Sequence, residues 1–99
     1  MAKRFEGQVA IVTGGADGLG KGICQRLSSE GAAVAIFDFN EAKMAETAEE
    51  LRKGGAKCVT QKVDVANEQA VKAAIDAVVA ELGRLDIMIN CAGIVGESE

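Results

Sequence analysis

The chain has 99 residues, of which 48% are hydrophobic and 26% are charged; this composition predicts one soluble globular domain and excludes an intrinsically disordered chain. The net charge of −4 and the scattered lysines and arginines argue against nucleic acid or an anionic membrane as a partner. The first apolar run, Val9–Val12, is too short for a signal-peptide core or a membrane span, so we expect a cytoplasmic protein.

Four apolar runs predict the strands of a parallel sheet. They are Val9–Val12, Ala33–Phe37, Cys58–Val63 and Leu85–Ile89. The first, second and fourth runs show little alternation with polar residues, which is typical of strands covered on both faces. The third run is more polar, so we place it at an edge of the sheet.

Helical patterns separate these runs. Apolar residues recur at helical spacing from Leu19 to Leu27, from Met44 to Leu51 and from Val71 to Leu82. Glycine ends each pattern, as is usual at the C-terminus of a helix, and Asn40 and Asn67 precede the second and third patterns as N-caps. The chain is therefore predicted to be an α/β protein with the order β-α-β-α-β-α-β.

Right-handed crossovers fold this order into the first half of a Rossmann-type doubly wound parallel sheet, with the strand order 3-2-1-4. The direction of winding reverses between the first and fourth strands, so a crevice is expected where these strands end, at Thr13-Gly14 and Ile89-Asn90. The fourth strand is left as an open edge without a proline or lysine to protect it. We therefore expect the 99 residues alone to be marginally stable and prone to associate.

The segment Thr13–Gly20 joins the first predicted strand to the first helix through a glycine-rich turn. Gly14 lets the chain leave the strand sharply, Gly18 lets the backbone approach a pyrophosphate, and Gly20 allows the helix to pack closely on the strand. The N–H groups at the start of the helix attract an anion. With an acid, Asp38, at the tip of the second strand, the arrangement predicts a dinucleotide site.

The same glycines partly fit a phosphate-binding P-loop, since Gly15 and Gly20-Lys21 occupy matching positions. The next residue is Gly22, where a P-loop needs a serine or threonine to bind Mg²⁺. No apolar run ends in a clear metal-binding acid. The sequence therefore argues against a nucleoside triphosphatase.

Acidic residues around the predicted ribose position favour NAD over NADP. The carboxylate of Asp38 can accept hydrogen bonds from ribose hydroxyls and would repel a 2′-phosphate. Asp17 in the turn adds a second negative charge, and Phe39 beside Asp38 supplies no cation. The predicted cofactor is NAD.

Three motifs resemble those of the short-chain dehydrogenase/reductase family. Thr13-Gly14-x-x-x-Gly18-x-Gly20 is similar to its glycine motif, Asp64-Val65 to its Asp-Val pair, and Asn90-Cys91-Ala92-Gly93 to its Asn-Asn-Ala-Gly motif, with Cys91 in place of the second asparagine. The resemblance implies that the carboxylate of Asp64 binds the adenine amino group and that the N–H of Val65 meets the ring. It also implies that Asn90 steadies the sheet and that Gly93 lies against the adenosine.

These arguments together give a set of expected cofactor-binding residues. They are Gly14, Asp17, Gly18, Leu19, Gly20, Asp38, Phe39, Asp64, Val65, Asn90, Ala92 and Gly93. The sequence contains no histidine, and its cysteines, Cys24, Cys58 and Cys91, form no C-x-x-C pair. We expect no metal site and interpret the cysteines as buried free thiols.

The resemblance implies an NAD-dependent oxidoreductase that transfers a hydride between a secondary alcohol or ketone and nicotinamide. The family's catalytic Tyr-x-x-x-Lys is missing, since the sequence has no tyrosine, so no catalytic residue is assigned. Residues 1–99 are interpreted as the NAD-binding part of a single-domain dehydrogenase whose catalytic part is absent from this chain, and which forms a dimer or tetramer as the full enzyme. The alternatives are a stand-alone dinucleotide-binding module and a family member that has lost activity.

Overall fold

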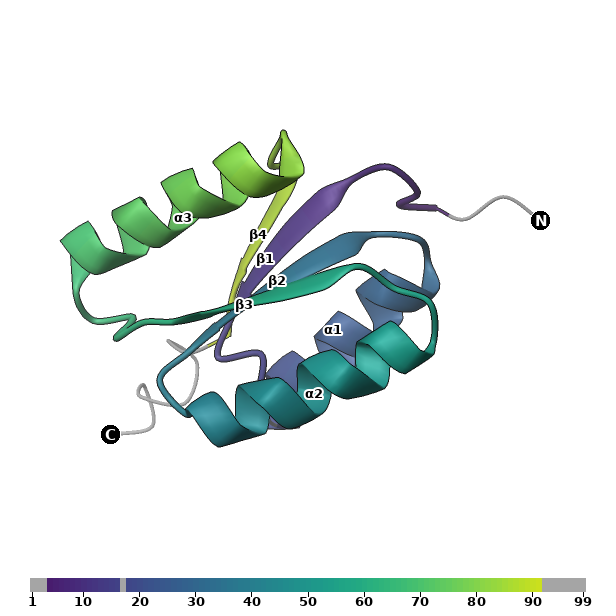
Figure 1. The fold of residues 1–99 in the computed structure, drawn as a ribbon, viewed down its shortest axis with the longest axis horizontal. Coiled ribbons are helices and arrows are strands. Elements are labelled where there is room, and N and C mark those ends of the chain that lie inside the picture. The colour runs from purple at the N-terminus through teal and green to yellow at the C-terminus, as the bar shows by residue number, and fades with distance from the viewer. Residues whose placement is uncertain (1–3, 17, 92–99) are drawn as a thin grey trace.

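The computed structural model describes residues 4–16 and 18–91, which form a four-stranded parallel sheet with helices on both faces (Figure 1). The elements in chain order are β1 (Val9–Thr13), α1 (Gly18–Ser29), β2 (Ala33–Asp38), α2 (Glu41–Lys53), β3 (Cys58–Lys62), α3 (Glu68–Leu82) and β4 (Ile87–Asn90). The strand order is β3-β2-β1-β4, which confirms the predicted Rossmann-type topology.

The two faces of the sheet carry different helices. Helices α1 and α2 cover one face, and α3 covers the other (Figure 1). Strand β1 is buried along its whole length, and β2 is buried from Val34 to Phe37, because both have a strand on each side and helices on both faces. The sequence reading of these two strands as covered on both faces is confirmed.

The two outer strands differ from the inner ones. Strand β3 is half-exposed, as its polar sequence predicts. Strand β4 lies at the other edge, as predicted, but its residues alternate between half-buried and exposed, with Met88 44% exposed. The expectation that this run is covered on both faces is therefore wrong for the described residues, because Met88, the register partner of Ile11, is not among the residues packed in the cluster under α3.

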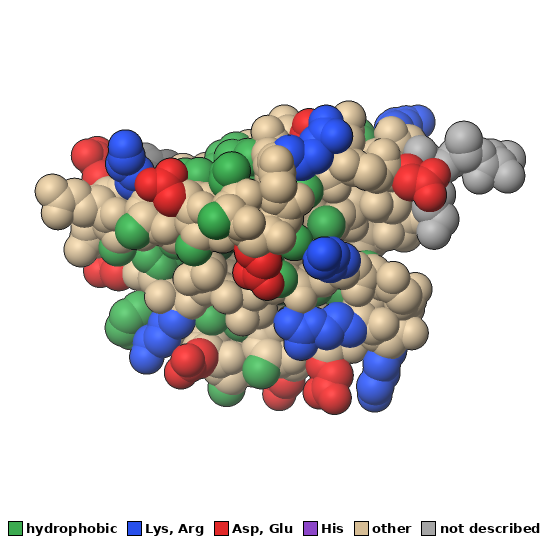
Figure 2. All heavy atoms as spheres, turned by 45° about the horizontal axis from the view of Figure 1, so that its top comes forward, with side chains coloured by type: hydrophobic (Ala, Val, Ile, Leu, Met, Phe, Trp, Pro, Cys, Tyr) green, Lys and Arg blue, Asp and Glu red, His purple; other side chains and the backbone are tan. Residues whose placement is uncertain are grey.

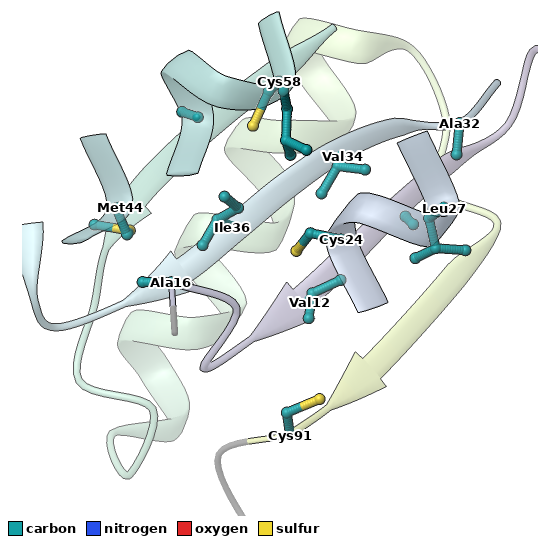
Figure 3. Close-up of a cluster of buried hydrophobic side chains, with 13 residues drawn as sticks. Val12, Ala16, Cys24, Leu27, Ala32, Val34, Ile36, Met44, Cys58 and Cys91 are labelled. Carbon is teal, nitrogen blue, oxygen red and sulfur yellow. The ribbon is translucent and has the colours of Figure 1, made fainter. Parts of the chain in front are cut away.

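Two apolar clusters hold the layers together. The first lies between the sheet and helices α1 and α2 and includes the side chains drawn in Figure 3. The second lies between the sheet and α3 and centres on Ile11, Phe37 and Val78, each with 0% exposure. The predicted N-caps are confirmed, because the side chains of Asn40 and Asn67 accept hydrogen bonds from the N–H groups of residues 43 and 70.

Charged side chains of both signs occur on the surface (Figure 2). On the face shown in Figure 2, acidic and basic side chains are mixed, and the basic ones do not gather into a stripe. Within residues 4–16 and 18–91, no helix is long and apolar enough to span a bilayer.

Candidate cofactor-binding site

The C-terminal ends of the four parallel strands bring the predicted site residues to one edge of the sheet. Thr13 at the end of β1 is paired in register with Phe37 of β2 and with Asn90 of β4. Asp38 follows Phe37 and is paired with Lys62 of β3. Residues far apart in the sequence therefore meet at the edge where doubly wound sheets bind ligands.

The glycine turn begins with a left-handed residue. Gly14 has a φ of 68°, a conformation that other residues adopt only with strain, and its N–H donates to the carbonyl of Phe37 at 2.7 Å. The chain thereby leaves β1 while still bonded to β2. The predicted sharp exit at Gly14 is confirmed by this geometry.

The glycine turn is tightly packed at Gly20, where it meets β1, and has free space at Gly18, at the start of α1. A Cβ on Gly20 would collide with the backbone of Gly14 and Gly15, so α1 packs directly on the end of β1. A Cβ on Gly18 would meet nothing within 4 Å, and Leu19 is 63% exposed. The first N–H groups of a helix lack partners within the helix, and here the first turn of α1 contains no acid among its residues. The open turn fits an anionic group such as a pyrophosphate.

The carboxylate of Asp38 connects the glycine turn to the loop after β2. One oxygen, Oδ2, accepts from the N–H of Ala16 at 3.3 Å, and the other, Oδ1, accepts from the N–H of Asn40 at 3.1 Å. The side chain is half-buried, so each oxygen keeps further lone pairs on the open side. Asp38 is therefore fixed in place and can still accept hydrogen bonds from hydroxyl groups.

Thr13 of β1 and Asn90 of β4 are hydrogen-bonded to each other at the ends of these paired strands. The hydroxyl of Thr13 donates to Oδ1 of Asn90 at 2.7 Å, and the N–H of Cys91 donates to the carbonyl of Thr13 at 3.1 Å. The first bond fixes the orientation of the Asn90 amide. This arrangement fits a role for Asn90 in steadying the central sheet.

The other predicted residues lie on exposed loops near the same edge. Asp64 follows the end of β3, and its Oδ1 accepts from the N–H of Ala66 at 3.0 Å. Val65 is 37% exposed and Phe39 is 66% exposed. Asp17, Ala92 and Gly93 were also predicted to bind the cofactor, and they lie outside the described residues.

Sequence reasoning missed one cation beside Asp38. Lys62 is the register partner of Asp38, and its ammonium lies 5.2 Å from the centre of the Phe39 ring and 3.9 Å from Oε1 of Glu41. The argument from the sequence considered only loop residues next to Asp38. The only available signal was the position of Lys62 at the end of the third apolar run, two residues before Asp64.

The cysteines are buried and free, as predicted. Burial raises the pKa of Cys24 to about 12 and that of Cys58 to about 11, and it also raises the pKa of Cys91. These thiols are protonated at neutral pH and contribute packing volume to the first cluster (Figure 3). Among the residues that the structure describes, no group of three or more metal-binding side chains occurs.

Comparison with known proteins identifies the family. The family model of short chain dehydrogenases matches residues 8–99. The chain belongs to this family. It is 43% identical over 89 residues to 3beta-hydroxysteroid dehydrogenase 2 of Eggerthella lenta, covering 90% of this chain and 34% of that protein.

Solved structures of short-chain dehydrogenases have the same fold. An NAD⁺-bound xylitol dehydrogenase aligns with 87% of this chain and 33% of its own at a TM-score of 0.84 and 32% identity. Carveol dehydrogenase from Mycobacterium avium, in complex with NAD, aligns with 88% of this chain and 36% of its own at a TM-score of 0.84 and 34% identity. The chain spans about one third of the length of the curated relatives it matches.

Proposed function

We propose that residues 1–99 form the NAD-binding part of a short-chain dehydrogenase, which transfers a hydride between a secondary alcohol or ketone and nicotinamide. The observation that carries this proposal is the contact between the glycine turn and Asp38, whose Oδ2 accepts from the N–H of Ala16 at 3.3 Å. The hydrogen bond places the N–H groups at the start of α1 and the carboxylate proposed to bind the ribose next to each other. The NAD-bound structures of xylitol and carveol dehydrogenases support it.

The proposed binding mode divides the cofactor among the strand ends. The turn at Gly14 and the start of α1, including Gly18, Leu19 and Gly20, hold the pyrophosphate with Asp17 beside it. Asp38 accepts from the ribose hydroxyls, and Phe39, Asp64 and Val65 border the adenine. Asn90 steadies the central sheet, and Gly93, with its neighbour Ala92, is assigned to the adenosine. When bound, NAD supplies the position that accepts or donates the hydride, and this chain binds and orients it.

The preference for NAD over NADP depends on Asp38. Its carboxylate is held by two backbone N–H groups, so it cannot turn away from a 2′-phosphate without breaking both hydrogen bonds. Lys62 is paired with Glu41 at 3.9 Å, and this pairing offsets the attraction that the cation would exert on a phosphate. The negative charge at Asp38 therefore decides the preference.

NADH fluorescence of the native protein that contains these residues tests this proposal directly, because the reduced nicotinamide absorbs and emits at longer wavelengths than aromatic side chains do. Asp38→Ala removes the carboxylate and should weaken NADH binding by about 1–3 kcal/mol, the cost of unpaired hydrogen-bonding groups. Asp38→Asn is the matched control, because it keeps an acceptor but removes the charge, and it should raise the affinity for NADPH relative to NADH. Equal or tighter binding of NADPH by the unchanged protein would contradict the proposal.

A stand-alone dinucleotide-binding module is the second candidate. The observation that favours it is that these 99 residues contain no tyrosine, the residue to which the family's acid–base chemistry is assigned. The intact mass of the protein in its source cells separates the two candidates. A mass above about twice the 10.2 kDa of this chain supports the dehydrogenase, and a mass of 10.2 kDa supports the module.

For the dehydrogenase, we further propose a small-molecule alcohol or carbonyl substrate, a homodimer or homotetramer, and a cytoplasmic location. Assays of the native protein with alcohols and ketones, together with its mass in solution, test the first two. The substrate class follows from the hydride chemistry of nicotinamide.

A further inference from the structure

A buried threonine of α2 is bonded to the glycine turn. Thr47 is 1% exposed, and its hydroxyl donates to the carbonyl of Ala16 at 2.9 Å, across 31 residues of sequence. Ala16, in the turn between β1 and α1, belongs to the same buried cluster as Met44 of α2. Figure 3 shows Ala16 next to the C-terminal end of β2. The hydrogen bond therefore joins the second helix to the turn between β1 and α1.

Thr47 is the polar member of an otherwise apolar helix face. The other buried residues of α2 are Met44, Ala48 and Leu51. A hydroxyl in such a position is costly unless it is hydrogen-bonded, and a buried carbonyl without a donor is costly as well. The pairing of Thr47 with Ala16 satisfies both groups.

The bond adds a second contact that fixes the turn, besides that of Asp38. The N–H of Ala16 donates to Asp38 at 3.3 Å, and its carbonyl accepts from Thr47, so both polar backbone groups of this residue are held. Ala16 lies between Gly14, where the chain leaves β1, and Gly18, where α1 begins. Its orientation therefore determines how the start of α1 faces the open side of the turn.

We propose that Thr47 is a positioning residue for the dinucleotide, acting through Ala16 on the turn that holds the pyrophosphate. The inference rests on the proposed function for its ligand. A turn that is already fixed before binding loses less conformational entropy when the ligand arrives, so the hydroxyl contributes to affinity without touching the ligand. Asp38 and Thr47 thus hold one residue of the turn from two elements, β2 and α2.

Three variants of the native protein that contains these residues test the inference. Thr47→Val removes the hydroxyl at nearly constant shape and should raise the Kd for NADH about three- to tenfold, as expected for one lost hydrogen bond. Thr47→Ser keeps the hydroxyl and should restore the Kd to within about twofold of the original value. Ala48→Gly, one residue along the same buried face, lowers helix stability without touching the bond and should leave the Kd unchanged. If Ala48→Gly weakens NADH binding as much as Thr47→Val does, the effect is general destabilisation and the inference is overturned.

Amide hydrogen exchange of the ligand-free protein provides a readout that does not depend on NADH. In Thr47→Val, exchange at the N–H of Ala16 should accelerate by about tenfold or more, because the carbonyl of the same residue is released and the turn opens more often. Exchange at Gly14 should stay unchanged, since that N–H is bonded to Phe37. Unchanged exchange at Ala16 overturns the inference whatever the NADH result. Failure of the original protein to bind NADH overturns the proposed function instead, and the exchange rates then still decide whether Thr47 holds the turn.

Discussion

The backbone at Gly20 leaves no room for a side chain, and substitution there tests whether the turn needs a glycine at this position. An ideal Cβ at Gly20 would lie against the carbonyl oxygen of Gly14 and 2.8 Å from both the Gly14 carbonyl carbon and the Cα of Gly15. These neighbours are backbone atoms, which no change of rotamer can move away. Gly20→Ala must therefore push α1 away from the end of β1.

The magnitude follows from two opposing effects. Overpacking a buried position costs about 1–3 kcal/mol and more where the neighbours cannot move. Replacing a helical glycine by alanine contributes about 1 kcal/mol in the opposite direction. The contacts at this position place the clash at the upper end of its range, about 3 kcal/mol. After subtraction of the gain in helix propensity, we expect Gly20→Ala to destabilise the protein by about 2 kcal/mol.

Gly22→Ala is the matched control on the same helix. A Cβ at Gly22 would meet nothing within 4 Å, so only the gain in helix propensity remains, and stability should rise by about 0.5–1 kcal/mol. Urea denaturation of the two variants gives the two free energies of unfolding, and NADH titration gives the affinities. Gly20→Ala should also weaken NADH binding, because the helix start moves. A Gly20→Ala midpoint equal to or above that of the unchanged protein would refute the steric argument.

The sheet topology could be predicted because it depends on local patterns and on the handedness of crossovers. The boundary of β4 could not, because it depends on one tertiary contact. The sequence run begins at Leu85, but the strand begins at Ile87. The N–H of Asp86 still donates to the carbonyl of Val9 at 2.9 Å, but the N–H of Val9 donates to the carboxylate of Asp86 at 2.8 Å, so a side chain replaces the next backbone acceptor.

The glycine turn and Asp38 could be located in the sequence because strand ends and glycines have local signatures. Thr47 had a weaker signal. It occupies a position on the apolar face of α2, and a hydroxyl there must find a buried partner, but the sequence does not say which one. Lys62 had only its position at the end of the third apolar run as a signal, because its place beside Asp38 depends on the register between β2 and β3.

Two further predictions concern the thiols and one carboxylate outside the proposed site. Burial raises the pKa of Cys24 to about 12 and that of Cys58 to about 11, so iodoacetamide at pH about 8 should alkylate both only as fast as the protein unfolds. Peptide mass spectrometry checks this, and fast alkylation of the native protein would contradict it. The hydrogen bond from Arg84 and, next, that from the Val9 N–H lower the pKa of Asp86. A carboxyl with a lowered pKa in the folded state stabilises the fold above its unfolded pKa of about 4 and loses that contribution as the pH falls through its folded pKa. Urea midpoints measured from about pH 6 downward should therefore fall more steeply below about pH 4 for the original protein than for Asp86→Asn, which cannot ionise. If the urea midpoints of the two proteins fall equally with pH, the ionised Asp86 does not stabilise the contact between β1 and β4.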